Sequence, residues 1–272
     1  MTSNTHTMRQ QFAAQSVIEE LLKQQSSAPP QSSFARFFGR SPLGADSVAW
    51  HAGAKGEIAV GSLLAQLPPD WTVFHALPIG TRGSDIDHLV IGPGGIFTIN
   101  TKHHNGKRIW IGKRSMMVAG QKVPHIRNAE FEADRVTKLL RERMPLLAPV
   151  QPMIAIVAPS QITVREAPER VKVIDARHLR RWLTKRPAIL TESETAAVAG
   201  IIDSPATWGA QPSREPEDLM AQFSALDADV RSARTRRVLW KLLGAGTTLG
   251  AGVAVLPNLL SALMALFAGA VG

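Results

Sequence analysis

Cysteine is absent from this chain of 272 residues. Its absence excludes disulfide bonds, thiolate metal sites and a thiol nucleophile. No two histidines have the i, i+4 spacing of a helical zinc site, and no serine lies in a nucleophile-elbow motif. The chemistry that remains is that of carboxylates, amides and basic side chains.

Acidic residues are in the minority. The chain has 31 lysines and arginines against 22 aspartates and glutamates, which gives a formal net charge of +9. This excess favours a polyanionic partner, either nucleic acid or an anionic membrane surface. The N-terminus has no apolar signal-peptide core. Hydrophobic residues make up 44% of the chain, which is enough for the core of one or two folded domains.

The most informative stretch of the sequence runs from Asp85 to Lys102. Two apolar segments, 86–91 and 96–101, flank a Pro-Gly-Gly turn. The turn is too short for anything but an antiparallel hairpin. Apart from the polar residues at the open end of the hairpin, both strands are apolar on both faces, which is typical of central strands. If the turn is centred between its proline and the first glycine, the numbers of paired residues add up to 187.

This register places four polar side chains on one face at the open end of the hairpin. Asp87 faces Asn100 and Asp85 faces Lys102, because side chains on one face of a strand repeat every second residue. Metal-assisted phosphodiester cleavage requires a carboxylate that holds a divalent cation, beside a lysine that stabilises the developing negative charge. The alternative is a structural Asp–Lys pair beside a turn.

A third acidic group lies upstream of the hairpin. The pattern predicts a helix over 53–67, which ends before two prolines and has an apolar stripe that includes Val60. Glu57 lies on the same stripe, three residues earlier. It is either a carboxylate directed at the hairpin site or a glutamate favoured by the helix dipole.

Further periodic segments complete the fold prediction. They predict strands over 71–77, 107–111, 115–118, 151–158 and 171–174, and helices over 8–25, 127–143, 176–183 and 193–202. This order predicts an α/β fold with a mixed sheet flanked by helices. We expect four regions: an N-terminal helix and flexible linker (1–46), a folded domain (47–204), a linker and charged helix (205–237), and a C-terminal segment (238–272).

The C-terminal segment has no charged residue after Lys241. The residues from Leu242 to Gly272 are mostly apolar, and as a helix they exceed the ~30 Å hydrocarbon core of a bilayer. We predict a transmembrane helix within 238–272. The basic residues before it predict that the main domain is cytoplasmic. The alternative is an apolar tail that is buried in an oligomer or lies in the membrane interface.

The motifs, in this order, resemble a known family. Three segments are similar to the signature of the NERD (nuclease-related) domain: 53–57 (Gly-Ala-Lys-Gly-Glu), 85–97 (from Asp-Ile-Asp-His) and 101–102 (Thr-Lys). That family is placed in the PD-(D/E)XK nuclease-like superfamily. The resemblance implies an αβββαβ core and a Mg²⁺-dependent endonuclease-type site. In this site Glu57 and Asp87 would bind the metal and Lys102 would be the catalytic lysine.

The sequence departs from the family pattern at Asn100, where the superfamily has Glu or Asp. Asparagine offers a neutral carbonyl oxygen, which is a weaker ligand for a hard cation than a carboxylate. The resemblance still implies one Mg²⁺ or Mn²⁺ ion. The expected ligands are Asp87, Glu57, Asn100 and the backbone carbonyl of Thr101, and the groups that would supply the missing charge are Asp85 or Glu132.

Four basic residues follow the hairpin: Lys107, Arg108, Lys113 and Arg114. In a nuclease they would contact the phosphates of the nucleic-acid backbone. The alternative is an ordinary solvated hairpin face.

The sequence therefore predicts a membrane-anchored nuclease that hydrolyses phosphodiester bonds of nucleic acid with Mg²⁺ or Mn²⁺. DNA is the predicted nucleic acid. Two alternatives stay open. In the first, Asn100 has removed catalysis and the domain only binds nucleic acid at the membrane. In the second, the positive charge serves only anionic lipid. Formation of a homo-oligomer is also left open.

Overall fold

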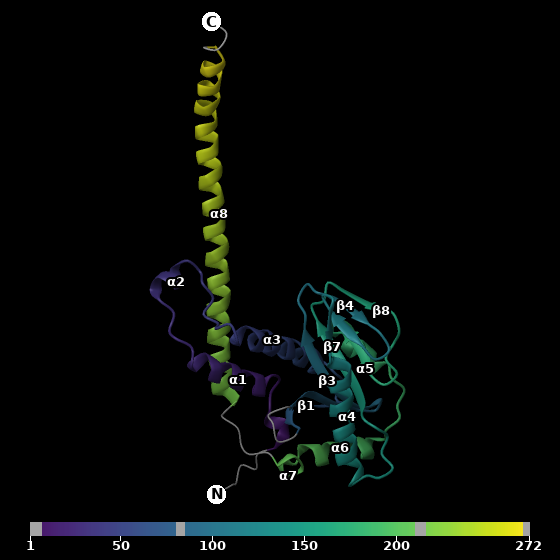
Figure 1. Ribbon diagram of the computed structural model, residues 1–272. Coiled ribbons are helices and arrows are strands. Elements are labelled where there is room, and N and C mark those ends of the chain that lie inside the picture. The colour runs from purple at the N-terminus through teal and green to yellow at the C-terminus, as the bar shows by residue number, and fades with distance from the viewer. Residues whose placement is uncertain (1–6, 80–84, 210–215, 269–272) are drawn as a thin grey trace. The chain divides into compact units, whose positions relative to one another are not determined.

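The structure is a computed structural model that describes residues 7–79, 85–209 and 216–268 (Figure 1). The side chains of Pro216 and of residues 244–268 are outside this description. The chain forms two compact units. The first comprises 1–26 and 46–221, and the second comprises 27–45 and 222–272. The predicted folded domain, 47–204, falls within the first unit.

The first unit is built on a mixed five-stranded sheet in the order β1-β2-β3-β7-β9. Its strands are β1 (Thr72–Pro78), β2 (Asp85–Gly92), β3 (Gly95–His103), β7 (Gln151–Val157) and β9 (Lys172–Asp175). The first three strands are antiparallel to one another, whereas β7 and β9 continue the sheet in parallel. The predicted mixed sheet is thus confirmed.

Helices cover both faces of this sheet. On one face, α3 (Ser47–Leu64) packs through Val60 and Leu64 against Phe97 of β3. On the other face, α4 (His125–Arg141) packs through Val136 against Leu89 of β2. Because residues 89 and 97 lie on opposite faces of the hairpin, the two helices sandwich it. The order α3-β1-β2-β3-α4-β7 is the αβββαβ core that the resemblance implied.

A second, four-stranded sheet of order β6-β5-β4-β8 lies beside α4. Its strands are β4 (Arg108–Ile111), β5 (Met116–Val118), β6 (Gln121–Val123) and β8 (Gln161–Val164). Ile109 and Ile111 of β4 point inward and pack with Ile126 of α4. The sequence predicted the β4–β5 hairpin but not β6, β8 or the sheet that they complete.

The remaining elements of the first unit are short. They are η1 (Met8–Gln10), α1 (Gln15–Ser26), η2 (Ala176–His178), α5 (Leu179–Thr184), α6 (Glu192–Asp203) and α7 (Pro205–Trp208). Helix α1 packs on α3, and Met8 is fully buried in the same hydrophobic cluster as β2 and α4. Residues between Met8 and Ser26 therefore contribute to the core of this unit.

The second unit contains α2 (Ser33–Phe37) and most of the long helix α8 (Pro216–Ala268). Helix α2 falls in the stretch that we predicted as a flexible linker. Its neighbouring residues pack on α8 through defined contacts, such as the hydrogen bond from Arg237 Nε to the carbonyl of Gly39.

Helix α8 is continuous across the boundary that we predicted between a charged helix and a C-terminal anchor at 238–272. The side chains of the anchor from residue 244 onward, and all of residues 269–272, lie outside the described residues. In the part of the chain that the structure describes, no helix is both long enough and apolar enough to cross a membrane. The predicted transmembrane helix thus has no support from the structure.

Candidate nuclease site

The predicted register of the central hairpin is confirmed. The β2–β3 ladder pairs His88 with Ile99 and Gly92 with Gly95, so paired numbers add up to 187 as expected. At the open end of the hairpin, beyond the pair His88–Ile99, the backbone N–H of Thr101 donates a 2.6 Å hydrogen bond to Oδ2 of Asp87. This bond turns the Asp87 carboxylate toward the end of β3 and fixes it there.

Glu57 and Asp87 form the buried acidic centre of the site. Their side chains come from α3 and β2, and the residues are only 5% and 8% exposed. Burial, together with the charges of Asp87 and Asp85, raises the pKa of Glu57 to about 10. Burial also raises the pKa of Asp87 to about 6. These shifts indicate two carboxylates that lack enough positive charge nearby.

Lys102 is the basic group that these acids share. Its charge counteracts the rise in pKa of Glu57, Asp85 and Asp87, and it does the same for Glu132. Burial raises the pKa of Asp85 as well. One lysine therefore faces four carboxyl groups, and full ionisation would leave the site strongly negative.

Asn100 makes an unexpected bond across the face of the sheet. Its Nδ2 donates a 2.7 Å hydrogen bond to Oε1 of Glu132 on α4. Burial, followed by the charge of Asp87, raises the pKa of Glu132 to about 8. From the sequence, Glu132 was named as a group that would supply the negative charge that Asn100 lacks. The structure brings Glu132 into direct contact with Asn100.

Behind the acidic centre lies a chain of buried polar groups that the sequence did not reveal. His88 is fully buried and contacts His75 through a 2.8 Å bond between the two Nδ1 atoms. Its Nε2 lies 3.2 Å from the hydroxyl of Thr101. The side chain of Thr101 thus contacts His88, and its backbone N–H is bonded to Asp87. His75 could not be found from sequence because its partner lies on a different strand.

A second histidine pair lies near Lys102. His104, just after β3, stacks on His125 at the start of α4, with ring centroids 5.6 Å apart. Burial is the main cause that lowers the pKa of both residues, and the charge of Lys102 is the next. The pKa of His125 falls to about 4. Nothing in the sequence around His125 signalled this position, which depends on the packing of α4.

The site can be tested for its fit to a divalent cation. Among the described residues, no three side chains of His, Asp or Glu are grouped so that they alone could hold a metal ion. Four buried oxygens nevertheless lack a hydrogen-bond partner there: Oε2 of Glu57, Oδ2 of Asp85, Oδ1 of Asn100 and Oε2 of Glu132. Hard cations such as Mg²⁺ prefer oxygen donors. The donor atoms therefore fit such an ion, although the acids do not form a closed triad.

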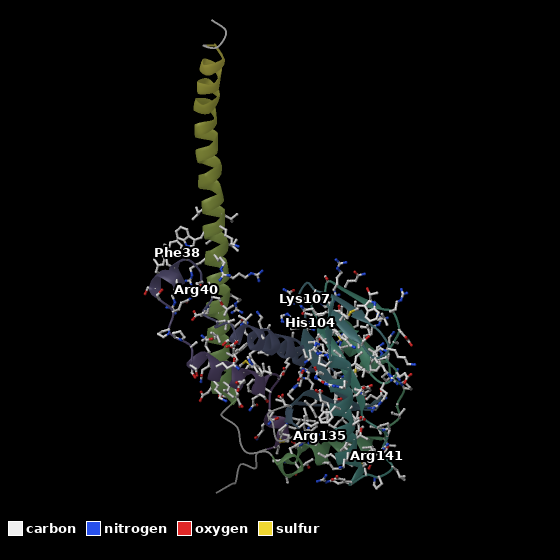
Figure 2. All side chains as sticks on the ribbon, in the orientation of Figure 1. Phe38, Arg40, His104, Lys107, Arg135 and Arg141 are labelled. Carbon is white, nitrogen blue, oxygen red and sulfur yellow. The ribbon has the colours of Figure 1, made fainter. Side chains whose placement is uncertain are left out.

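The predicted phosphate contacts divide into two groups. Lys107 and Arg108 line a cavity of about 620 Å³ on the second sheet, together with the indole of Trp110. Lys113 instead forms an ion pair with Glu169, at 2.7 Å, and Arg114 is exposed. Lys107 lies close to His104, at the opposite end of the unit from Arg135 and Arg141 (Figure 2).

Register explains how the cavity is formed. Ile109 and Ile111 point into the core, so Arg108 and Trp110 point out of the sheet. Trp110 pairs with Thr163 of β8 on one side and with Met117 of β5 on the other. The outward face thus presents an aromatic ring with basic groups beside it.

An αβββαβ core with acids, an amide and a lysine gathered at the open end of its central hairpin defines a nuclease-like α/β domain. Residues 52–157 match the family model described as NERD, nuclease-related domain. The match confirms the resemblance found from the sequence, and it includes every site residue from Glu57 to Glu132. No match was found among curated proteins or among solved structures.

Proposed function

We propose that the nuclease-related domain hydrolyses phosphodiester bonds of nucleic acid, with Mg²⁺ or Mn²⁺ as cofactor. The observation that carries this proposal is the burial of several carboxyl groups around Lys102, with four oxygens that lack partners. Unpaired buried acids are costly. A bound cation would remove that cost, and the same cation would serve metal-assisted cleavage of a phosphodiester bond.

Each residue has a distinct task in this proposal. Glu57 and Asp87 hold the cation, together with the side-chain oxygen of Asn100 and the backbone carbonyl of Thr101. When bound, the cation supplies charge for the phosphate and lowers the pKa of a water molecule. Lys102 stabilises the negative charge that develops on the phosphate.

Glu132 and Asp85 complete the charge balance. The hydrogen bond from Asn100 to Glu132 uses the amide N–H₂ and leaves the amide oxygen free to face a cation. Glu132 also supplies a carboxylate next to the position where the family pattern has one. Asp85 adds negative charge at the edge of the same site. Both features support retention of a cation despite the substitution at position 100.

A second candidate function is nucleic-acid binding without cleavage. The cavity beside Lys107, Arg108 and Trp110 favours it, because basic groups beside a half-buried aromatic ring suit phosphates and a stacked base. In this case the acidic site would not turn over substrate. The same cavity would serve the nuclease as its substrate-binding surface, so binding alone does not separate the two functions.

We further propose that the C-terminal segment 238–272 holds the protein at a membrane, with the nuclease-related domain on the cytoplasmic side. The support is the uncharged sequence after Lys241 and the basic residues before it. DNA is the proposed nucleic acid, and self-association is compatible with this arrangement.

The experiment that separates the two functions measures binding and cleavage on the same full-length preparation. Plasmid and single-stranded DNA are incubated with Mg²⁺, Mn²⁺ or EDTA, and binding is measured in EDTA. Asp87→Asn and Lys102→Met are compared with the surface controls Asp70→Asn and Lys185→Gln.

The nuclease predicts metal-dependent cleavage that both site variants lose and both controls retain. Binding without cleavage by the wild-type protein in either metal would overturn the nuclease and leave the binding module. Asp87→Asn is a mild change, because its amide oxygen can still accept the hydrogen bond from Thr101.

A further inference from the structure

A short segment of the second unit is fixed on α8 by contacts that leave no room for a larger side chain. Gly39 has φ +73°, and a Cβ atom there would lie 2.4 Å from the backbone nitrogen of Arg237. Arg237 Nε donates a 3.1 Å hydrogen bond to the Gly39 carbonyl. Trp240 Nε1 donates a 3.0 Å bond to the carbonyl of Phe37. Residues 37–39 therefore follow one turn of α8 closely.

This packing gathers four aromatic rings. The ring centroids of Phe34 and Phe38 lie 4.7 Å apart with the rings tilted at 56°. The rings of Phe37 and Phe38 each lie about 5 Å from the ring of Trp240, centroid to centroid. The rings are nevertheless open to solvent, with Phe34 75% and Phe37 57% exposed. Isolated exposed phenylalanines are common, but a contiguous cluster marks an interaction surface.

The cluster lies where α8 changes character. Trp240 directly precedes Lys241, the last charged residue of the chain. On the N-terminal side, exposed arginines such as Arg234 and Arg237 line the helix. On the C-terminal side, Leu242 and Leu243 are more than half exposed, and the uncharged helix continues to Ala268, about 40 Å further. Two segments distant in sequence thus put aromatic rings at one level of the helix.

We propose that this aromatic–arginine surface (Phe34, Phe37, Phe38, Arg40, Arg237, Trp240) lies in the headgroup region of an anionic lipid bilayer. Aromatic rings favour the boundary between hydrocarbon and water. Arginines at the same depth pair with anionic headgroups. The surface offers both groups side by side, and α2 is the element that presents the phenylalanines.

Charge decides between a bilayer and a second copy of the chain as the occupant. A second copy would bring the same arginines against this surface, and like charges repel. Arg36 does contact Asp229, but at 4.0 Å and with both side chains largely exposed, so this pair offsets little of the positive charge. An anionic membrane is complementary in both charge and hydrophobicity. The inference does not depend on cleavage by the first unit.

The absence of native cysteine makes a site-specific test simple. Ser33→Cys on the full-length chain places the environment-sensitive dye NBD beside the phenylalanines without removing one. Leu146→Cys, at a fully exposed position of the first unit, is the matched control. Both proteins are mixed with vesicles of phosphatidylcholine alone or with added phosphatidylglycerol, and NBD emission and quenching by iodide are recorded.

The proposal predicts a blue shift and loss of iodide quenching for the dye at position 33, stronger with phosphatidylglycerol, and neither change at position 146. Phe34→Ser with Phe38→Ser should abolish the shift, while Phe131→Ser, an exposed phenylalanine of α4, should not. Vesicle binding that leaves the dye at position 33 in water would show that the tail alone contacts lipid. A lipid-independent shift that grows with protein concentration would identify a second copy as the occupant. Either result would overturn the proposal.

Discussion

Asn100 on β3 and Glu132 on α4 are joined by a 2.7 Å hydrogen bond from the amide nitrogen to the carboxyl group. The bond links β3, the strand of Lys102, to the helix on the opposite side of the site from α3. It places an acid beside Asn100, which is the main departure of the sequence from the family pattern. The first two predictions test this relationship.

Restoring the carboxylate at position 100 should strengthen metal binding and weaken the metal-free fold. Asn100→Asp removes the donor to Glu132 and sets two carboxyl groups together. We expect it to lower the free energy of unfolding in EDTA by about 1–3 kcal/mol. In Mg²⁺ the added ligand should raise the melting temperature more than in the wild-type protein. Thermal unfolding with and without Mg²⁺ measures this, with Asn105→Asp in an exposed loop as control. An equal response to Mg²⁺ in both proteins would contradict the account.

Glu132→Gln should separate the charge of Glu132 from its hydrogen bond. A glutamine oxygen can still accept from Asn100, so the fold should be preserved. The loss of one negative charge should weaken Mg²⁺ binding, and cleavage should need more Mg²⁺ to reach the same rate. Titration of the cleavage rate with Mg²⁺ tests this. Unchanged Mg²⁺ dependence would show that Glu132 only supports Asn100 structurally.

The histidine behind the site should make the protein sensitive to acid. Burial lowers the pKa of His75 to about 4, below its usual value near 6.5. A group whose pKa is lowered on folding contributes stability that is complete above pH ~6.5 and is lost as the pH falls toward 4. Unfolding by urea at several pH values measures this. Between pH 6.5 and 4 the free energy of unfolding should fall less steeply for His75→Asn than for the wild-type protein. A parallel loss in both proteins would show that His75 is not the responsible group.

The basic cavity on the second sheet should carry part of the affinity for nucleic acid. Replacing Lys107 and Arg108 with glutamine should reduce the slope of log K against log salt by roughly 2, one unit for each phosphate contact. Lys113→Gln should change it less, because Lys113 is paired with Glu169. Fluorescence anisotropy in EDTA measures the slopes. Equal slopes for all three proteins would place the phosphate contacts elsewhere.

Gly39→Ala should loosen the segment that α8 holds. Its Cβ would collide with the backbone of α8, and its positive φ adds strain. Gly106→Ala is a matched control, because Gly106 has φ +67° and no atom within 4 Å of an added Cβ. Hydrogen exchange of residues 33–40 should accelerate in the first variant alone. Equal exchange in the Gly39 variant and the wild-type protein would show that the segment tolerates a side chain there.

The central hairpin could be predicted because its signals are local. Alternating faces and a two-residue turn fix both the strands and their register. The helices α3 and α4 were predicted from their apolar stripes and the prolines that follow them. The resemblance then implied the roles of Glu57 and Lys102. By contrast, β6 and β8 have only three and four residues, and β6 is mostly polar. Such strands form because neighbouring strands offer hydrogen bonds, which no local pattern announces.

The parts of the site that the sequence missed are long-range contacts. His75 meets His88 across two strands, and His125 meets His104 between a helix and a loop. Glu132 was named only as a source of charge, and its bond to Asn100 depends on how α4 lies on the sheet. Likewise, α2 was predicted as part of a linker because its partner on α8 is some 200 residues away in sequence. Pairings of this kind are set by packing, not by spacing along the chain.

The most direct test of the central claim is the initial rate of DNA cleavage by the full-length protein as a function of Mg²⁺ concentration, for the wild type and Asp87→Asn. A metal-dependent nuclease built on Asp87 should show a rate that saturates with Mg²⁺, vanishes in EDTA and falls by about 10²-fold or more in the variant. A rate that persists in EDTA, or that is the same in Asp87→Asn, would contradict a metal-dependent nuclease built on Asp87.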